Sequence, residues 1–150
     1  MASAIDVSTE RILRKALYAA IKDDDDEFER QLESFATKEA LVSACARATD
    51  LAALVLLEQF EGRPTEEAVQ KLAANAASLA EAWSGISTAE FAAFINAVFE
   101  GTPIEEVLPT GVALRVPFVF AGDMLARYHK ADEEWFDFLD RLWETLEDRA

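Results

Sequence analysis

The sequence predicts an all-α fold, a single compact domain of six or seven helices over residues 1–150 with orthogonal or bundle-like packing. Apolar residues recur at helical spacing from end to end, and capping or breaking residues separate the runs. The composition is 51% hydrophobic with only 5 Gly and 4 Pro, which excludes a disordered or low-complexity chain. A chain of this length buries roughly 70% of its unfolded surface, enough for one core.

Three helices are predicted in the first 60 residues. The first covers about 8–22, and the second covers about 26–35 after an acidic run that supplies an N-cap and favourable charge at the positive helix end. Thr37 caps the third, which ends near Phe60. Its later half is apolar nearly all round, so we expect this helix at the centre of the fold with the last helix packed across it.

Two further helices are predicted between residues 64 and 101. Pro64 and Thr65 open the first of them and Gly85 ends it. The second follows Ser87 and ends at Gly101, because Ser87 and Glu90 have the spacing of a capping box. The apolar face expected on the first helix consists of Val69, Leu72, Ala76, Leu79 and Trp83.

The segment after residue 101 is the least regular. One short turn is expected over 102–108, and Pro117 then interrupts either a helix or a strand. A lone strand would have no partner, so we predict a helix over 110–129, bent at Pro117. The last helix, about 132–148, has an apolar face roughly 160° wide, which predicts contact with two neighbours or with one neighbour and a partner chain.

A faint internal repeat suggests duplication of the chain. Acidic helix starts followed by Leu recur by chance as well, so both explanations stay open. The matching segments are 28–32 with 104–108, 40–50 with 113–123, and 66–72 with 133–139.

Charge and location signals agree with each other. The chain has 14 Lys and Arg against 29 Asp and Glu, a net charge of −15, so we expect no nucleic-acid partner recruited by charge attraction. The most apolar window, 40–57, carries Arg47 and Asp50, which favours a core helix over a membrane span. A single cysteine, with no secretory signal in residues 1–15, indicates a cytoplasmic protein. Its high Ala and acidic content is typical of a GC-rich bacterial genome.

No residue pattern predicts a catalytic, cofactor or metal site. The common hydrolase and nucleotide-binding motifs do not occur in the sequence. His129 has only Asp132 and Glu133 at helical spacing, too few ligands for a transition metal. Cys45 falls on an apolar helix face, where burial raises the pKa of a thiol. We therefore expect no cofactor, and an enzyme ranks third among the interpretations.

Two groups of residues are the candidate sites. The wide face of the last helix predicts an interaction surface made of Trp135, Phe136, Leu139 and Trp143. Two helical ion pairs are Arg47 with Asp50 and Asp123 with Arg127; they face one polar cleft if the two halves are pseudo-symmetric, and they are two separate surface pairs otherwise.

The leading functional hypothesis is a non-enzymatic accessory protein that binds another protein, or a second copy of itself as a homodimer, through the last helix. The alternative is a helical bundle that binds a small molecule in an apolar pocket, with Pro117 opening space between helices and Asp123 or Arg127 at the mouth.

Overall fold

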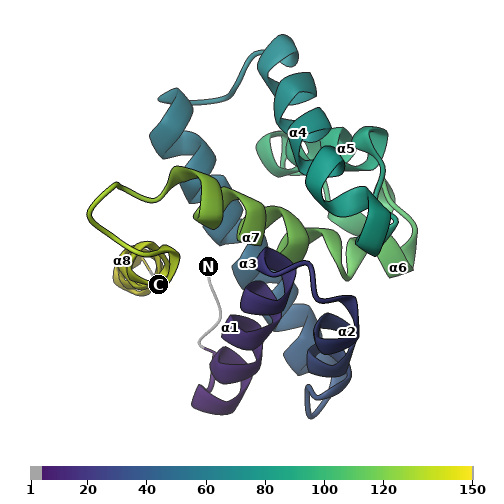
Figure 1. The fold of residues 1–150 in the computed structure, drawn as a ribbon, viewed down its shortest axis with the longest axis vertical. Helices are drawn as coiled ribbons and strands as arrows, with labels where there is room; N and C mark the ends of the chain where they lie inside the picture. The colour runs from purple at the N-terminus through teal and green to yellow at the C-terminus, as the bar shows by residue number, and fades with distance from the viewer. Residues whose placement is uncertain (1–4, 150) are drawn as a thin grey trace.

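The computed structural model describes residues 5–149, with the side chains of 5–148, and this part of the chain is entirely helical apart from its turns. The all-α prediction is confirmed (Figure 1). The elements in chain order are α1 Val7–Ile21, α2 Asp25–Glu33, α3 Lys38–Phe60, α4 Glu66–Ser84, α5 Thr88–Glu100, the 3-10 turn η1 Ile104–Glu106, α6 Thr110–Ala113, α7 Val116–Tyr128 and α8 Trp135–Arg149.

Local side-chain caps explain where the helices begin. Thr37 accepts a hydrogen bond from the Ala40 amide at 3.0 Å, and Thr65 and Ser87 cap α4 and α5 in the same way. The predicted capping box is present: the Ser87 amide donates to Glu90 Oε1 at 2.9 Å, and the Glu90 amide donates to Ser87 Oγ at 3.2 Å. These bonds satisfy backbone donors that a helix start leaves without partners.

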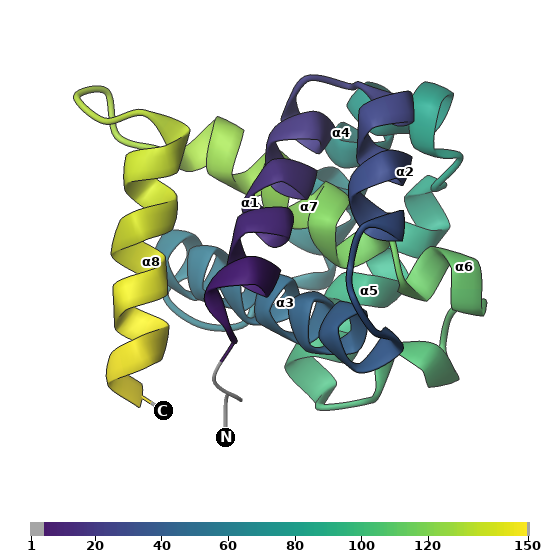
Figure 2. The ribbon, with the colours of Figure 1, turned by 90° about the horizontal axis from the view of Figure 1, so that it is seen from below.

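The helices α3 and α7 pack together at the centre, and the others surround them. In both views α1 and α2 lie side by side, α4 and α5 form a second pair, and α8 lies at the end of the molecule away from α6 (Figures 1 and 2). The central position predicted for α3 is correct, and α8 packs on α3 as expected, but α8 also packs on α7. The core between these helices is rich in aromatic rings, among them Phe91, Phe94, Phe118 and Phe120.

The prediction of one helix over 110–129 bent at Pro117 is wrong. The chain forms two helices, α6 and α7, and breaks between them at residues 114–115. Pro117 sits in the first turn of α7, where its missing N–H removes no helical hydrogen bond. Arg115 holds the break in place. Its guanidinium donates to both carboxylate oxygens of Glu29 on α2, at 2.7 and 2.8 Å, and to the Gly111 carbonyl at 3.1 Å.

Three smaller expectations also need correction. The last helix begins at Trp135 rather than 132, because residues 130–134 form a turn in which the Lys130 amide donates to Glu133. The second helix ends at Glu33, two residues early, and Phe35 packs into the core from the loop. Leu79, predicted on the core face of α4, is 56% exposed, because helical spacing puts it at the edge of the buried face formed by Val69, Leu72 and four alanines.

Duplication of the chain stays a prediction. Residues 40–50 lie in one continuous helix, whereas the matching segment 113–123 spans the break between α6 and α7. The two segments therefore differ in local structure.

Within the described residues, one helix, α3, is long and apolar enough to cross a membrane by length and composition. Half of its apolar window is buried against the other helices. A core helix passes the same test, so the pattern is weak evidence for a span.

Replacement of Gly122 tests the close approach of α1 and α7. A Cβ atom at Gly122 would lie 3.3 Å from the Leu17 carbonyl oxygen and 3.4 Å from Ala20 Cβ. Gly122→Val should lower the free energy of unfolding by about 2 kcal/mol, because its branched side chain crowds α1. The exposed Ala126→Val on the same helix is the control and should cost less than about 1 kcal/mol. Equal losses in urea denaturation would contradict the close approach.

Candidate functional site

The face of α8 that was predicted to bind a partner is largely buried within the chain. Leu139 is fully buried and Trp143 is 6% exposed. The Trp143 ring packs against two guanidinium groups, with Arg47 Cζ 4.6 Å and Arg14 Cζ 5.3 Å from its centroid. Leu139 and Trp143 are therefore removed from the predicted interaction surface, because α8 uses them to contact its own neighbours.

The other two residues of that face lie at the start of α8. Trp135 is half-buried and stacks on Tyr18 of α1, with centroids 5.7 Å apart and planes 13° apart. Phe136 is 48% exposed. With Ile21 and Lys22 of α1, these rings border a shallow hollow of about 520 Å³. The exposed aromatic surface is much smaller than the sequence predicts.

The structure does not bring the two predicted ion pairs into one cleft. Arg127 Nη2 binds the Asp123 carboxylate at 3.1 and 3.3 Å, as expected. Burial raises the pKa of Asp123, Arg127 opposes this rise, and the charge of Asp23 adds to it. Arg47 is 2% exposed and lies under α8, whereas Asp50 lines a separate groove. The expectation of a shared polar cleft is therefore corrected.

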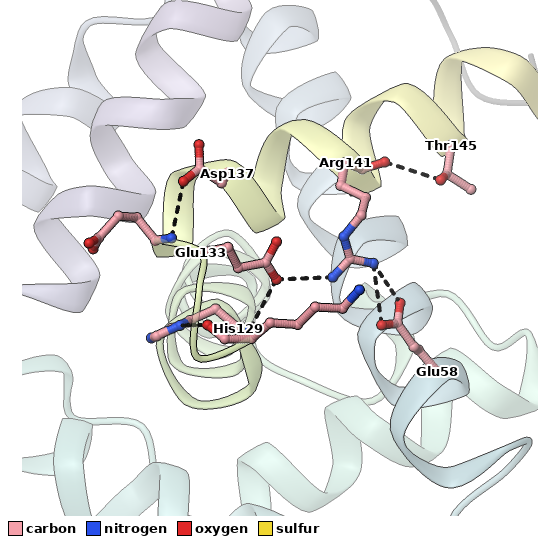
Figure 3. A network of polar contacts seen from close by, with 8 residues as sticks. Glu58, His129, Glu133, Asp137, Arg141 and Thr145 are labelled. Carbon is pink, nitrogen blue, oxygen red and sulfur yellow. Dashed lines mark hydrogen bonds and ion pairs between the residues drawn. The ribbon is translucent and has the colours of Figure 1, made fainter.

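A polar network links α8 to the rest of the molecule (Figure 3). Arg141 on α8 donates to both oxygens of Glu58 on α3, each at 3.3 Å, and to Glu133 Oε1 at 3.1 Å. Arg141 thus fixes the position of Glu133. In the same turn, His129 Nδ1 lies 2.9 Å from the Lys130 carbonyl oxygen. No group of three or more metal-ligating side chains occurs among residues 5–149. The network positions α8 and its preceding turn.

The largest hollow that we identify is a groove of about 740 Å³ beside α3. Its walls come from α3, the end of α5, the segment 101–105 with η1, and α6 with the start of α7. Pro117, buried in the first turn of α7, lies in the wall, so the region predicted for a pocket is hollowed. The apolar lining residues are Val42, Cys45, Ala46, Ala53, Ala97, Val98, Pro103, Ile104, Ala113, Leu114 and Pro117.

The helix α3 supplies one long wall of the groove. Its seven lining residues, at positions 38, 42, 45, 46, 49, 50 and 53, fall on one face of the helix and form a stripe about 22 Å long. The buried core stripe, which includes Ala48 and Leu51, lies on the opposite side of the helix. This second stripe explains why α3 is apolar nearly all round: one side faces the core and the other faces the groove.

Besides Lys38, three side chains of α3 in this wall carry polar or titratable atoms: Cys45, Thr49 and Asp50. Cys45 Sγ donates to the Leu114 carbonyl at 3.5 Å, and burial raises the pKa of the thiol to about 12. Thr49 Oγ1 donates to the Cys45 carbonyl at 2.8 Å. Burial also raises the pKa of the half-buried Asp50 carboxyl, and the charges of Arg47 and of the N-terminal amino group oppose this rise. No described residue donates a hydrogen bond to Asp50. Asp50 is therefore the charged group best placed to orient a bound molecule.

No family model, curated protein or solved structure matches this chain. The chemistry of the groove is consequently inferred from its own residues.

The groove differs from the predicted pocket in its polar residues. Pro117 lines it, but the prediction of Asp123 or Arg127 at the mouth is wrong, because Asp50 and Lys38 line the groove instead. The signal that was available is the stripe of small and apolar residues on the exposed side of α3. The opposite wall, with Ile104, comes from irregular segments that have no periodic pattern.

Cys45 reactivity tests the burial of the groove wall. Because the thiolate is the reactive form, a pKa rise from 9.0 to about 12 should lower the reaction rate at pH 8. We expect native Cys45 to react with a disulfide reagent roughly a thousandfold more slowly than in the urea-unfolded protein. Equal rates in the two states would show that the thiol is solvated in the folded chain.

Two substitutions on α8 separate its buried side from its exposed side. Trp143→Ala should lower the free energy of unfolding by about 3 kcal/mol or more, because it removes a ring packed against Arg14 and Arg47. Phe136→Ala, at an exposed position, should cost less than about 1 kcal/mol. Thermal or urea denaturation measures both, and a Trp143→Ala variant as stable as the parent would contradict this packing.

Proposed function

We propose that this protein binds a small, mainly apolar molecule in the groove between α3, α5, η1 and α6. The groove itself carries the proposal: its volume of about 740 Å³ falls within the range of roughly 300–1,000 Å³ typical of ligand pockets. Its lining is predominantly apolar and includes a few polar groups, among them Thr49 and Asp50, that can orient a ligand.

Self-association through α8 is less well supported. A stable interface buries about 800 Å² on each partner around a core of anchoring side chains. Leu139 and Trp143, the predicted anchors, are buried in the chain, and the large apolar residues exposed in this region are Tyr18 of α1 and Phe136 of α8. A protein partner that docks on these two rings is the second candidate function.

A catalytic role for the groove is not supported by its nucleophile. The Cys45 thiol, with a pKa of about 12, is protonated at neutral pH, and its hydrogen bond is to a backbone carbonyl rather than to a base. We therefore propose a binding protein rather than an enzyme.

We further propose that the protein works in the cytoplasm. Support comes from the single cysteine and from α3, whose apolar window is half buried among other helices. An acidic exterior, with a net charge of −15, is also compatible with high solubility.

Binding of a neutral, solvatochromic apolar dye such as Nile red tests the proposed groove. The dye should bind the protein with a blue-shifted emission and should raise the melting temperature by mass action. Ala46→Phe and Ala53→Phe place rings in the groove and should weaken dye binding at least tenfold. The exposed Ala74→Phe on α4 is the matched control and should bind like the parent.

Two results would overturn the proposal. One is dye affinity that stays unchanged in the Ala46→Phe, Ala53→Phe double variant, provided that circular dichroism shows a folded protein. The other is the absence of dye binding by the parent protein.

A further inference from the structure

We propose that the groove takes a single-chain amphiphile, with an apolar chain along α3 and a cationic amine head that binds the Asp50 carboxylate. This inference rests on the proposed function and adds the chemical class of the ligand. Three features support it: the length of the groove, the burial of the Asp50 carboxylate without a hydrogen-bond donor from the described residues, and the charged groups around Asp50.

The dimensions of the groove favour an extended chain. It follows α3 for about 22 Å, and a volume of about 740 Å³ over that length gives a mean cross-section of roughly 35 Å². A helix with its side chains is about 10–12 Å in diameter, which is a cross-section of roughly 80–110 Å² and more than twice that of the groove. A partner helix would therefore remain mostly outside, whereas one alkyl chain fits along the stripe of small residues that includes Ala46 and Ala53.

Asp50 gives this apolar wall a specific polar requirement. The carboxylate is half-buried, and it accepts no hydrogen bond from any of the residues that the structure describes. A partly desolvated carboxylate gains more from a charged donor than an exposed carboxylate does, because less water competes for its oxygens. An ammonium group supplies three donors and the opposite charge.

The charged groups around Asp50 also favour a cation. Glu105, in the opposite wall, has the same sign as Asp50. Lys38 is the cation in the lining, but it lies at the far end of the α3 stripe and is exposed, so water and salt screen its attraction for an anionic head. Arg47, which packs on Trp143 on the α8 side of α3, meets part of this need for positive charge, because its charge and that of the N-terminal amino group oppose the rise in the pKa of Asp50. The net charge of −15 adds a long-range preference for cationic over anionic ligands.

Three ligands with the same chain test the head group: octylamine, 1-octanol and octanoate, each titrated at pH 7 by calorimetry and by displacement of Nile red. We expect octylamine to bind at least tenfold more tightly than 1-octanol, and octanoate to bind most weakly. In Asp50→Asn the advantage of octylamine over 1-octanol should disappear, while the affinity for 1-octanol should stay unchanged.

A matched charge change controls for the overall field of the protein. Asp148→Asn removes one negative charge, as Asp50→Asn does, but at an exposed position on α8. It should still bind octylamine more tightly than 1-octanol. Asp50→Asn should fold well, because burial already disfavours the charged form of Asp50 and raises its pKa. Its circular dichroism spectrum and melting temperature verify this.

The outcomes separate this inference from the proposed function. Equal binding of the three ligands, tightest binding of octanoate, or equal loss of the amine preference in both variants would overturn the inference. So would Nile red binding that none of the three ligands displaces. In each of these cases the groove would remain a binding site for apolar molecules. Only failure of Nile red itself to bind would remove the proposed function as well.

Discussion

The fold depends on the burial of α3, a 23-residue helix that is covered from several directions. Its core side packs on α1 and α7, and α8 covers a third side, where Trp143 lies over the guanidinium of Arg47. A buried guanidinium is costly unless its charge finds favourable contacts, and an aromatic face provides one while excluding water. The position of α8 is thus tied to the composition of α3. The remaining side of α3 faces the groove, so the proposed binding surface is a consequence of how this helix is packed.

Local interactions explain which parts of the fold were predictable. The helix starts at Thr37, Thr65 and Ser87 were identified because each cap joins a side chain to an amide three residues later, so the sequence contains the whole interaction. The break before α7 could not be predicted in this way. It is held by Arg115 and Glu29, which lie 86 residues apart, and only the packed structure shows that they meet.

The candidate sites also combine features that sequence periodicity predicts with features that only tertiary packing determines. An apolar stripe on a helix predicts that the stripe is covered, but not whether a neighbour in the same chain or a second protein covers it. Leu139 and Trp143 are covered by neighbours in the same chain, and Arg14 of α1 and Arg47 of α3 lie over the Trp143 ring, so much of this aromatic face became part of the core. The groove was harder to predict than the α8 face. Its wall on α3 includes small residues such as Ala46, which do not individually predict a binding site, and its position depends on where α6 ends.

The two walls of the groove differ in how they are built, and this difference bears on ligand binding. The wall on α3 belongs to a long helix whose other side is packed into the core. Part of the facing wall consists of η1 and α6, which contribute no buried residue, with Leu108 buried in the segment between them, whereas the end of α5 and the start of α7 add the buried Ala97 and Pro117. Segments with few buried apolar contacts open and adjust at low free-energy cost, whereas core helices do not. One fixed wall that carries Asp50 and one adjustable wall suit a site that orients a polar head precisely while accepting apolar chains of different length.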